Sequence, residues 1–222
     1  ERIIGLNEVR SAVRDAKRDF EEGAVGAGTG TVCFGLKGGI GSASRQFTAG
    51  GSTYTVGALV QSNFGSTKNL VICGEPVGRA LEKKIKPADL DRGSIMTVIA
   101  TDLPLSDRQL KRVIRRAGVG LSRTGSFMGH GSGDIMIGFT TANRIPESTD
   151  QEVLTIRVLK ESSLDTAFTA AAEAVEEAVL NSLAMAETTV GYQGEIRYSL
   201  TDLWLADRGT REQPAAVFSM EE

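Results

Sequence analysis

Gly93 and Ser94 are the residues whose types and position most directly suggest chemistry. They open the run G-S-I-M-T-V-I-A-T-D at residues 93–102, whose β-branched side chains predict a half-buried strand. A glycine–serine step at the mouth of such a strand can be an ordinary turn. It can equally be a point of self-cleavage that frees the serine as an N-terminal nucleophile. The residue types alone leave both interpretations open.

Polar residues also stand at two other predicted strand ends. Ser132 and Asp134 lie two residues apart in a glycine-rich segment, so they face the same side if a strand begins there. Asn63 ends the mostly apolar run at residues 53–64. An asparagine at a strand end usually forms a turn, but it can also present its amide to a pocket.

The single histidine, His130, restricts the chemistry further. A zinc site built from several histidines cannot form, and a Ser-His-Asp triad could be built only around His130. If the chain is a hydrolase, we expect its base to be another group. Cys33 and Cys73 lie in apolar runs without the spacing of a metal site or a disulfide framework. We therefore predict no metal ion and a reducing compartment.

The glycine-rich segment at residues 23–51 does not match a phosphate-binding loop. A P-loop needs a lysine followed by serine or threonine, whereas Lys37 is followed by Gly38. The dinucleotide fingerprint lacks its third glycine. We therefore expect no cofactor here, and predict a short strand around residues 31–36 edged by shaped loops next to a site.

The composition is that of an ordinary globular protein. The 222 residues are 41% hydrophobic and 24% charged, with a formal net charge of −3, and they fit one layered α/β domain. There is no basic stripe that would indicate nucleic-acid binding and no apolar run long enough to span a bilayer. We expect a cytoplasmic protein. The chain does not begin with methionine, so we also expect a processed or trimmed piece.

The hydrophobic pattern predicts alternating helices and strands. Residues 53–64 are apolar enough for a strand covered on both faces. A single apolar helix face begins after Ser106, the predicted N-cap, and continues to Leu121. Further helices are expected at residues 6–20, within 75–92, at 162–187 and at 200–205, and further strands at 69–73 and in the segment after residue 132.

Several stretches together resemble the DmpA-like aminopeptidases, which comprise L-aminopeptidase/D-esterases and β-aminopeptidases. The matching runs are GAVGAGTGT (23–31), FGLKGGIGSASR (34–45), VGALVQSNFG (56–65), GSIMTVIATDLPL (93–105), RRAGVGLSRTGS (115–126), SGDI (132–135) and AVEEAVLNSL (174–183). They follow the family's order across nearly the whole chain. That is far more specific than any one motif.

The resemblance implies an α/β fold of four layers, an αββα sandwich similar to the N-terminal-nucleophile hydrolases. Such precursors cut themselves before a serine or threonine, and the matching bond here is Gly93–Ser94. Residues 1–93 and 94–222 would then be the α and β fragments of one domain, which stay together. Family members carry a further segment before the helix at residues 6–20. We therefore expect that this chain is truncated, or that this segment has been cleaved off or exists as another chain.

The resemblance also implies roles for the polar residues. Ser94 would attack the substrate carbonyl, with its own α-amine as base, because an N-terminal amine has a pKa of about 8. Ser132 and Asp134 match a Ser-x-Glu pair that assists proton transfer, with an acid one methylene shorter here. Asn63 matches the asparagine that stabilises the oxyanion.

The expected function is that of a self-processing serine aminopeptidase or amidase. Its substrates would be short peptides, amides or esters, and relatives assemble into homo-oligomers. One alternative is an acyltransferase similar to ornithine acetyltransferase, but those enzymes are expected to cleave before threonine. The other is a relative that keeps the fold without cleaving itself. Ser94, Ser132, Asp134 and Asn63 argue against such a loss of function.

Overall fold

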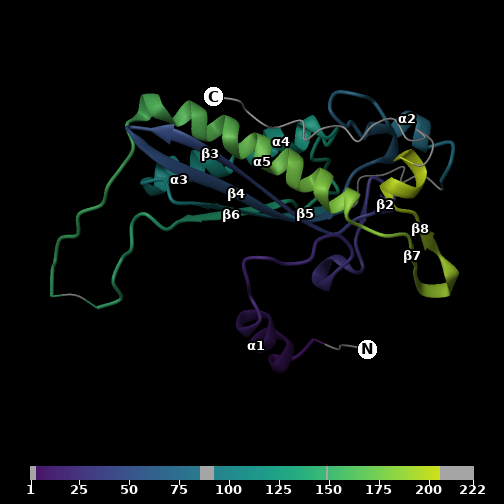
Figure 1. The fold of residues 1–222 in the computed structure, drawn as a ribbon, viewed down its shortest axis with the longest axis horizontal. Coiled ribbons are helices and arrows are strands. Elements are labelled where there is room, and N and C mark those ends of the chain that lie inside the picture. Colours follow the sequence, from purple (N-terminus) through teal and green to yellow (C-terminus); the bar gives the residue numbers. More distant parts are fainter. Residues whose placement is uncertain (1–3, 86–92, 149, 206–222) are drawn as a thin grey trace.

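A central sheet of four strands organises the chain (Figure 1). The computed structural model describes residues 4–85, 93–148 and 150–205. The strands lie in the order β3 (Ile40–Ala49), β4 (Ser52–Asn63), β5 (Ser94–Thr101) and β6 (Ile135–Thr140). The first three are antiparallel neighbours, whereas β5 and β6 run parallel. The strands predicted at 53–64, at 93–102 and after residue 132 are confirmed.

Three helices cover one face of this sheet (Figure 1): α3 (Asp107–Ile114), α4 (Ala117–Arg123) and α5 (Leu164–Ala184). The helix predicted at 162–187 is thereby confirmed. Its small side chains let it approach β3 closely. A Cβ added at Gly41 in β3 would lie 2.0 Å from the carbonyl oxygen of Ala178, so only glycine permits this contact.

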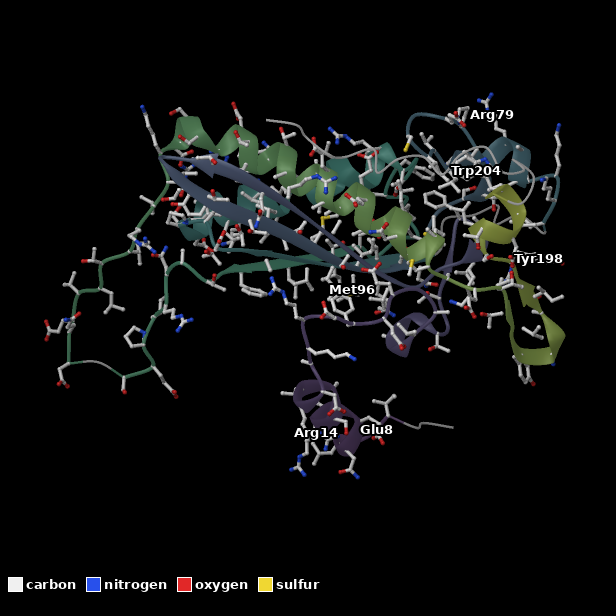
Figure 2. The ribbon with its side chains drawn as sticks, viewed as in Figure 1. Glu8, Arg14, Arg79, Met96, Tyr198 and Trp204 are labelled. Carbon is white, nitrogen blue, oxygen red and sulfur yellow. The ribbon has the colours of Figure 1, made fainter. Side chains whose placement is uncertain are left out.

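The opposite face of the sheet carries exposed apolar side chains. Along β5, Ile95 and Ile99 are fully buried on the helix side, while Met96 between them is 42% exposed. Figure 2 shows Met96 on the side of the sheet away from α5. The exposed apolar residues of this open face are Leu59, Met96, Ile135, Ile137 and Phe139. The expectation that residues 53–64 are covered on both faces is therefore wrong for the described part of the chain.

The N-terminal helix, α1 (Leu6–Arg14), is shorter than predicted. It lies on the opposite side of the sheet from α5 (Figure 1), and none of its residues is buried. Figure 2 shows Glu8 and Arg14 on it, away from the sheet. Isolated short helices are marginal without packing, which explains why the amphipathic pattern does not continue as helix to residue 20.

The glycine-rich segment folds differently from the prediction. The strand expected at 31–36 is a tight hairpin of β1 (Val32–Cys33) and β2 (Leu36–Lys37). Phe34 and Gly35 turn the chain with φ angles of 52° and 81°, as hairpin turns of two residues require. The longest missed element is β3, whose glycine, serine and alanine residues hide its strand character.

Three smaller predictions need correction or limits. The strand expected at 69–73 is a 3₁₀ turn, Thr67–Asn69, followed by a single bridge between Ile72 and Glu75. Ser106 caps α3 as predicted, but α3 and α4 are two helices. The connector 75–92 contains α2 (Gly78–Leu81), and residues 86–92 lie outside the described residues.

The remaining elements are short. They are the hairpin of β7 (Thr189–Val190) and β8 (Ile196–Arg197), the 3₁₀ turns Gly26–Gly28, Glu161–Ser163 and Tyr192–Gly194, and the π-helical turn Thr201–Leu205. The last of these confirms the helical pattern at 200–205. Within the described residues, the helices are too short or too polar to cross a membrane.

Candidate active site

Ser94 and Asn63 lie opposite each other at one end of the sheet. They are the last pair in the antiparallel register of β4 and β5. Side chains alternate between the two faces of a strand, so Ser94 projects on the same side as Met96, and Asn63 on the same side as Leu59. Both residues therefore belong to the open face. Ser94 is half-buried and Asn63 is exposed.

The Ser94 hydroxyl is held by two backbone groups. Its Oγ donates to the carbonyl oxygen of Gly93 at 2.8 Å and accepts the N–H of Gly133 at 3.0 Å. Gly133 reaches this position because β5 and β6 are parallel and pair Met96 with Ile135, two residues further along each strand. The hydroxyl oxygen is thus fixed beside the peptide group that precedes it.

Gly93 must be glycine for a steric reason. A Cβ at this position would lie 1.7 Å from the carbonyl oxygen of Asn63, well inside van der Waals contact. The backbone before Ser94 therefore packs directly against the end of β4. The interpretation of Gly93 as a simple turn residue does not account for this close approach.

Ser132 and Asp134 are joined to each other and to β5. Ser132 Oγ donates to Asp134 Oδ1 at 2.6 Å, and the N–H of Ile95 donates to the same oxygen at 3.1 Å. The carboxylate is therefore anchored to the residue that follows Ser94. Among the described hydrogen bonds, neither side chain bonds the Ser94 hydroxyl directly. The structure brings together all four residues that the sequence proposed.

The side-chain amide of Asn63 has a defined orientation. Its Oδ1 accepts the N–H of Val32 at 2.9 Å. Because an N–H group must face the oxygen of the amide and not its nitrogen, the Nδ2 group points away from Val32. The amide is thus set to donate on the side opposite the glycine-rich segment.

A buried lysine, missed as a site residue from the sequence, lies behind Asn63. Lys37 is 2% exposed, and its Nζ donates to the carbonyl oxygens of Gly28, Thr31 and Gly38 at 2.9, 2.9 and 2.7 Å. Burial lowers the pKa of Lys37, and the charge of Cys33 partly opposes this effect. The available signal in the sequence is a lysine inside the apolar run F-G-L-K-G-G. A lysine in a buried run indicates that polar partners hold its ammonium group, because lysine is rarely buried without them.

The other candidate features are separate from these residues. In the part of the chain that the structure describes, His130 is exposed and makes no hydrogen bond with Ser94, Ser132 or Asp134. The described residues include no group of three or more His, Cys, Asp or Glu side chains that could hold a metal ion. A hollow of about 390 Å³ between the glycine-rich segment and the β7–β8 hairpin adjoins the site through Val32.

Comparison with known proteins gives close matches. The model of peptidase family S58 matches residues 3–197. A beta-peptidyl aminopeptidase, BapA of Sphingosinicella microcystinivorans, is 41% identical over 203 residues, which cover 84% of this chain and 50% of BapA.

Solved structures agree with this match. A protein from Pyrococcus horikoshii OT3 is 50% identical with a TM-score of 0.84, over 90% of this chain and 54% of that one. An L-aminopeptidase D-Ala-esterase/amidase from Ochrobactrum anthropi is 38% identical with a TM-score of 0.78, over 87% of this chain and 54% of that one. It is described as a prototype for the serine aminopeptidases and a variant of the Ntn hydrolase fold. This chain spans about half the length of each of these relatives.

Proposed function

Because this chain belongs to peptidase family S58, we propose that the whole protein is a self-processing serine aminopeptidase or amidase. It removes the N-terminal residue from short peptides, amides or esters. The observation that carries the proposal is the Ser94 hydroxyl, held between the Gly93 carbonyl and the Gly133 N–H, with Asn63 opposite. The fold expected from the sequence, that of the N-terminal-nucleophile hydrolases, is confirmed by the Ochrobactrum anthropi structure. That enzyme and BapA are both named as aminopeptidases.

Self-cleavage is the first reaction. Ser94 Oγ attacks the carbonyl carbon of Gly93, its proton passes to the Ser94 nitrogen, and the C–N bond breaks to leave an ester. Water then hydrolyses the ester, which gives a carboxylate at Gly93 and a free α-amine and hydroxyl at Ser94. The fragments 1–93 and 94–222 stay together through the long pairing of β4 with β5.

Substrate hydrolysis uses the serine that cleavage exposes. The Ser94 α-amine, with a pKa of about 8, accepts the hydroxyl proton as Oγ attacks the substrate carbonyl. Asn63 Nδ2 donates to the oxyanion that forms, an effect commonly worth about 10²–10³ in rate. The proton then passes to the leaving amine, and water releases the acyl group. The Ser132–Asp134 pair stabilises the positive charge on the α-amine during these transfers.

The open face of the sheet has a role in this proposal. In an αββα sandwich a second sheet covers the inner face of the first, and the apolar residues around Met96 and Ile137 suit such a contact. Ser94 and Asn63 project on that same face. The whole protein therefore closes its site by adding a second β layer, with α1 packed on the outside of that layer.

The test combines mass spectrometry with a substrate panel. Intact mass and N-terminal sequencing of the purified whole protein should give two fragments, one of which begins at Ser94. A panel of L-, D- and β-aminoacyl p-nitroanilides should then identify the preferred residue, with N-acetylated versions as controls that lack the free amine. A single uncut chain under all conditions would contradict the processing step. Equal hydrolysis of the acetylated substrates would contradict the aminopeptidase assignment.

A further inference from the structure

Lys37 is a buried cation whose hydrogen bonds all go to one short segment. Its ammonium group has three N–H donors, and they bond the carbonyl oxygens of Gly28, Thr31 and Gly38. These carbonyls come from both sides of the β1–β2 hairpin. The lysine therefore ties the loop before β1 to the residue that follows β2.

One of these carbonyls belongs to the peptide group that holds Asn63. The C=O of Thr31 and the N–H of Val32 are parts of the same planar peptide unit. The C=O accepts from Lys37 at 2.9 Å, and the N–H donates to Asn63 Oδ1 at 2.9 Å. Since the two groups of a trans peptide point in opposite directions, fixing the carbonyl also fixes the direction of the N–H.

The segment rests directly on the end of β4, which leaves little room for another arrangement. A Cβ at Gly38 would lie 2.7 Å from the carbonyl oxygen of Ser62, the residue before Asn63. Ser62 also bonds the next residue along, Gly39, through its backbone N–H at 2.9 Å. A change at the ammonium is thus transmitted to Asn63 through contacts that cannot relax freely.

We propose that Lys37 is a positioning residue that orients the Asn63 amide through the Thr31–Val32 peptide. This inference rests on the proposed function, because Asn63 matters as the oxyanion donor. The positive charge strengthens the hydrogen bond to Thr31 relative to a neutral donor and polarises the peptide, so the Val32 N–H becomes a stronger donor to Oδ1. Lys37 never touches the substrate. It keeps the Nδ2 end of the amide turned toward the reacting carbonyl.

The kinetic test is a double-mutant cycle on the whole protein. Lys37→Met removes the charge at similar length and should lower kcat about 10- to 100-fold, below the roughly 10²–10³-fold expected for Asn63→Ala, with KM changed little. In the Asn63→Ala background, Lys37→Met should change kcat less than about 2-fold, because its effect passes through that amide. Lys84→Met is the control, since Lys84 also donates to a backbone carbonyl, that of Leu203, but away from the site.

A second measurement does not depend on activity. With ¹⁵N-labelled asparagine, the side-chain amide signal of Asn63 is identified as the one lost in Asn63→Ala. It should shift in Lys37→Met and stay unchanged in Lys84→Met. If Lys37→Met does not fold, Lys37→Gln is used instead, because its amide retains two N–H donors. It should shift the Asn63 amide signal in the same way but by less.

Two outcomes overturn the inference. One is an equal loss of kcat from Lys37→Met with and without Asn63. The other is an Asn63 amide signal that does not move in either Lys37 variant. Ser94→Ala is measured in parallel to separate the two proposals. Activity that survives Ser94→Ala refutes the proposed function, whereas the amide signal still tests the position of Asn63.

Discussion

The two faces of the central sheet are built for different purposes, although the same strands form both. On the helix side, Ile95 and Ile99 are fully buried against the helices. On the open side, Ser94 and Met96 alternate with them along the same strand. One face supplies packing and the other presents Ser94, the proposed nucleophile. Because side chains alternate between the two faces along β5, successive residues serve packing and the candidate site in turn.

The difference explains how a serine at a strand end is held rigidly. The buried isoleucines fix the backbone of β5, and that backbone carries Ser94 with it. The adjoining backbone groups, the Gly133 N–H and the Gly93 carbonyl, then fix the hydroxyl. The packed strand thus supports its short side chain through the backbone, on a rigid element of the fold. Under the proposed function, the open face also needs a cover that excludes water.

Removal of the proposed nucleophile should have the largest effect. Ser94→Ala takes one hydroxyl from the open face and leaves the helix face intact, so the protein should fold but neither cleave itself nor hydrolyse amides. We expect kcat to fall by about 10⁴-fold or more, with a single chain seen by intact mass. Ser122→Ala, which changes an exposed serine on α4, is the control. It should leave both self-cleavage and kcat unchanged. Substantial activity in Ser94→Ala would move the nucleophile elsewhere, with Ser132 the next candidate.

A matched pair of isoleucines compares the two faces directly. Ile99 is 0% exposed and Ile137 is 53% exposed. In the 222-residue chain, Ile99→Ala should lower the free energy of unfolding by about 2–5 kcal/mol, and Ile137→Ala by less than about 1 kcal/mol. Urea unfolding measures both.

The same pair tests the proposed second β layer. If that layer covers the open face in the whole protein, Ile137→Ala should become nearly as costly there as Ile99→Ala. An unchanged small effect of Ile137→Ala in the whole protein would show that the face stays open, and would contradict the four-layer arrangement at this position.

The sequence predicted the elements whose pattern is local. The strand at Ser94, the helix at 162–187 and the cap at Ser106 all follow from periodicity and residue type. The strand β3 is missed from the sequence, because Gly41 serves a close contact with α5 that only the folded chain reveals, and the serines beside it weaken the strand pattern. The helix at 6–20 was overextended, because amphipathicity does not show whether a partner surface is present.

The sequence indicates which residues form the candidate site, but not the contacts that hold them in place. Residue type and position single out Ser94, Asn63, Ser132 and Asp134, whereas their roles come from the family resemblance. The structure brings the four residues together. The residues that hold them, Lys37 among them, act through backbone groups, which leave no side-chain motif to read. In the sequence, Lys37 fails the pattern of a phosphate loop, because Gly38 follows it. Its burial depends on three carbonyls that are far apart in any extended chain.

Asp134 is bonded to the residue that follows Ser94, and its charge should matter less than the Ser94 hydroxyl. Asp134→Asn keeps an oxygen that can accept from Ser132 and from the Ile95 N–H, so the geometry should persist while the charge is lost. We expect kcat to fall about 10- to 100-fold through weaker assistance to proton transfer. Ser132→Ala should lower kcat by a factor in the same range. If Asp134→Asn shows wild-type kcat from pH 6 to 9, Asp134 acts only as a strand anchor.

The smallest effect concerns Lys37, which is as buried as the helix face yet charged. Burial lowers its pKa below the ordinary value of 10.5, so between the two values the unfolded chain binds more protons than the folded one. The free energy of unfolding of the wild type, relative to Lys37→Met, should therefore rise as the pH increases through this interval and level off above about 10.5. Urea unfolding at several alkaline pH values measures the difference, with Cys33→Ala in both proteins so that the neighbouring thiol does not titrate. The prediction fails if this difference in the free energy of unfolding stays constant or falls with pH. In that case the three carbonyls would compensate fully for the burial of the ammonium group, which would not destabilise the folded chain.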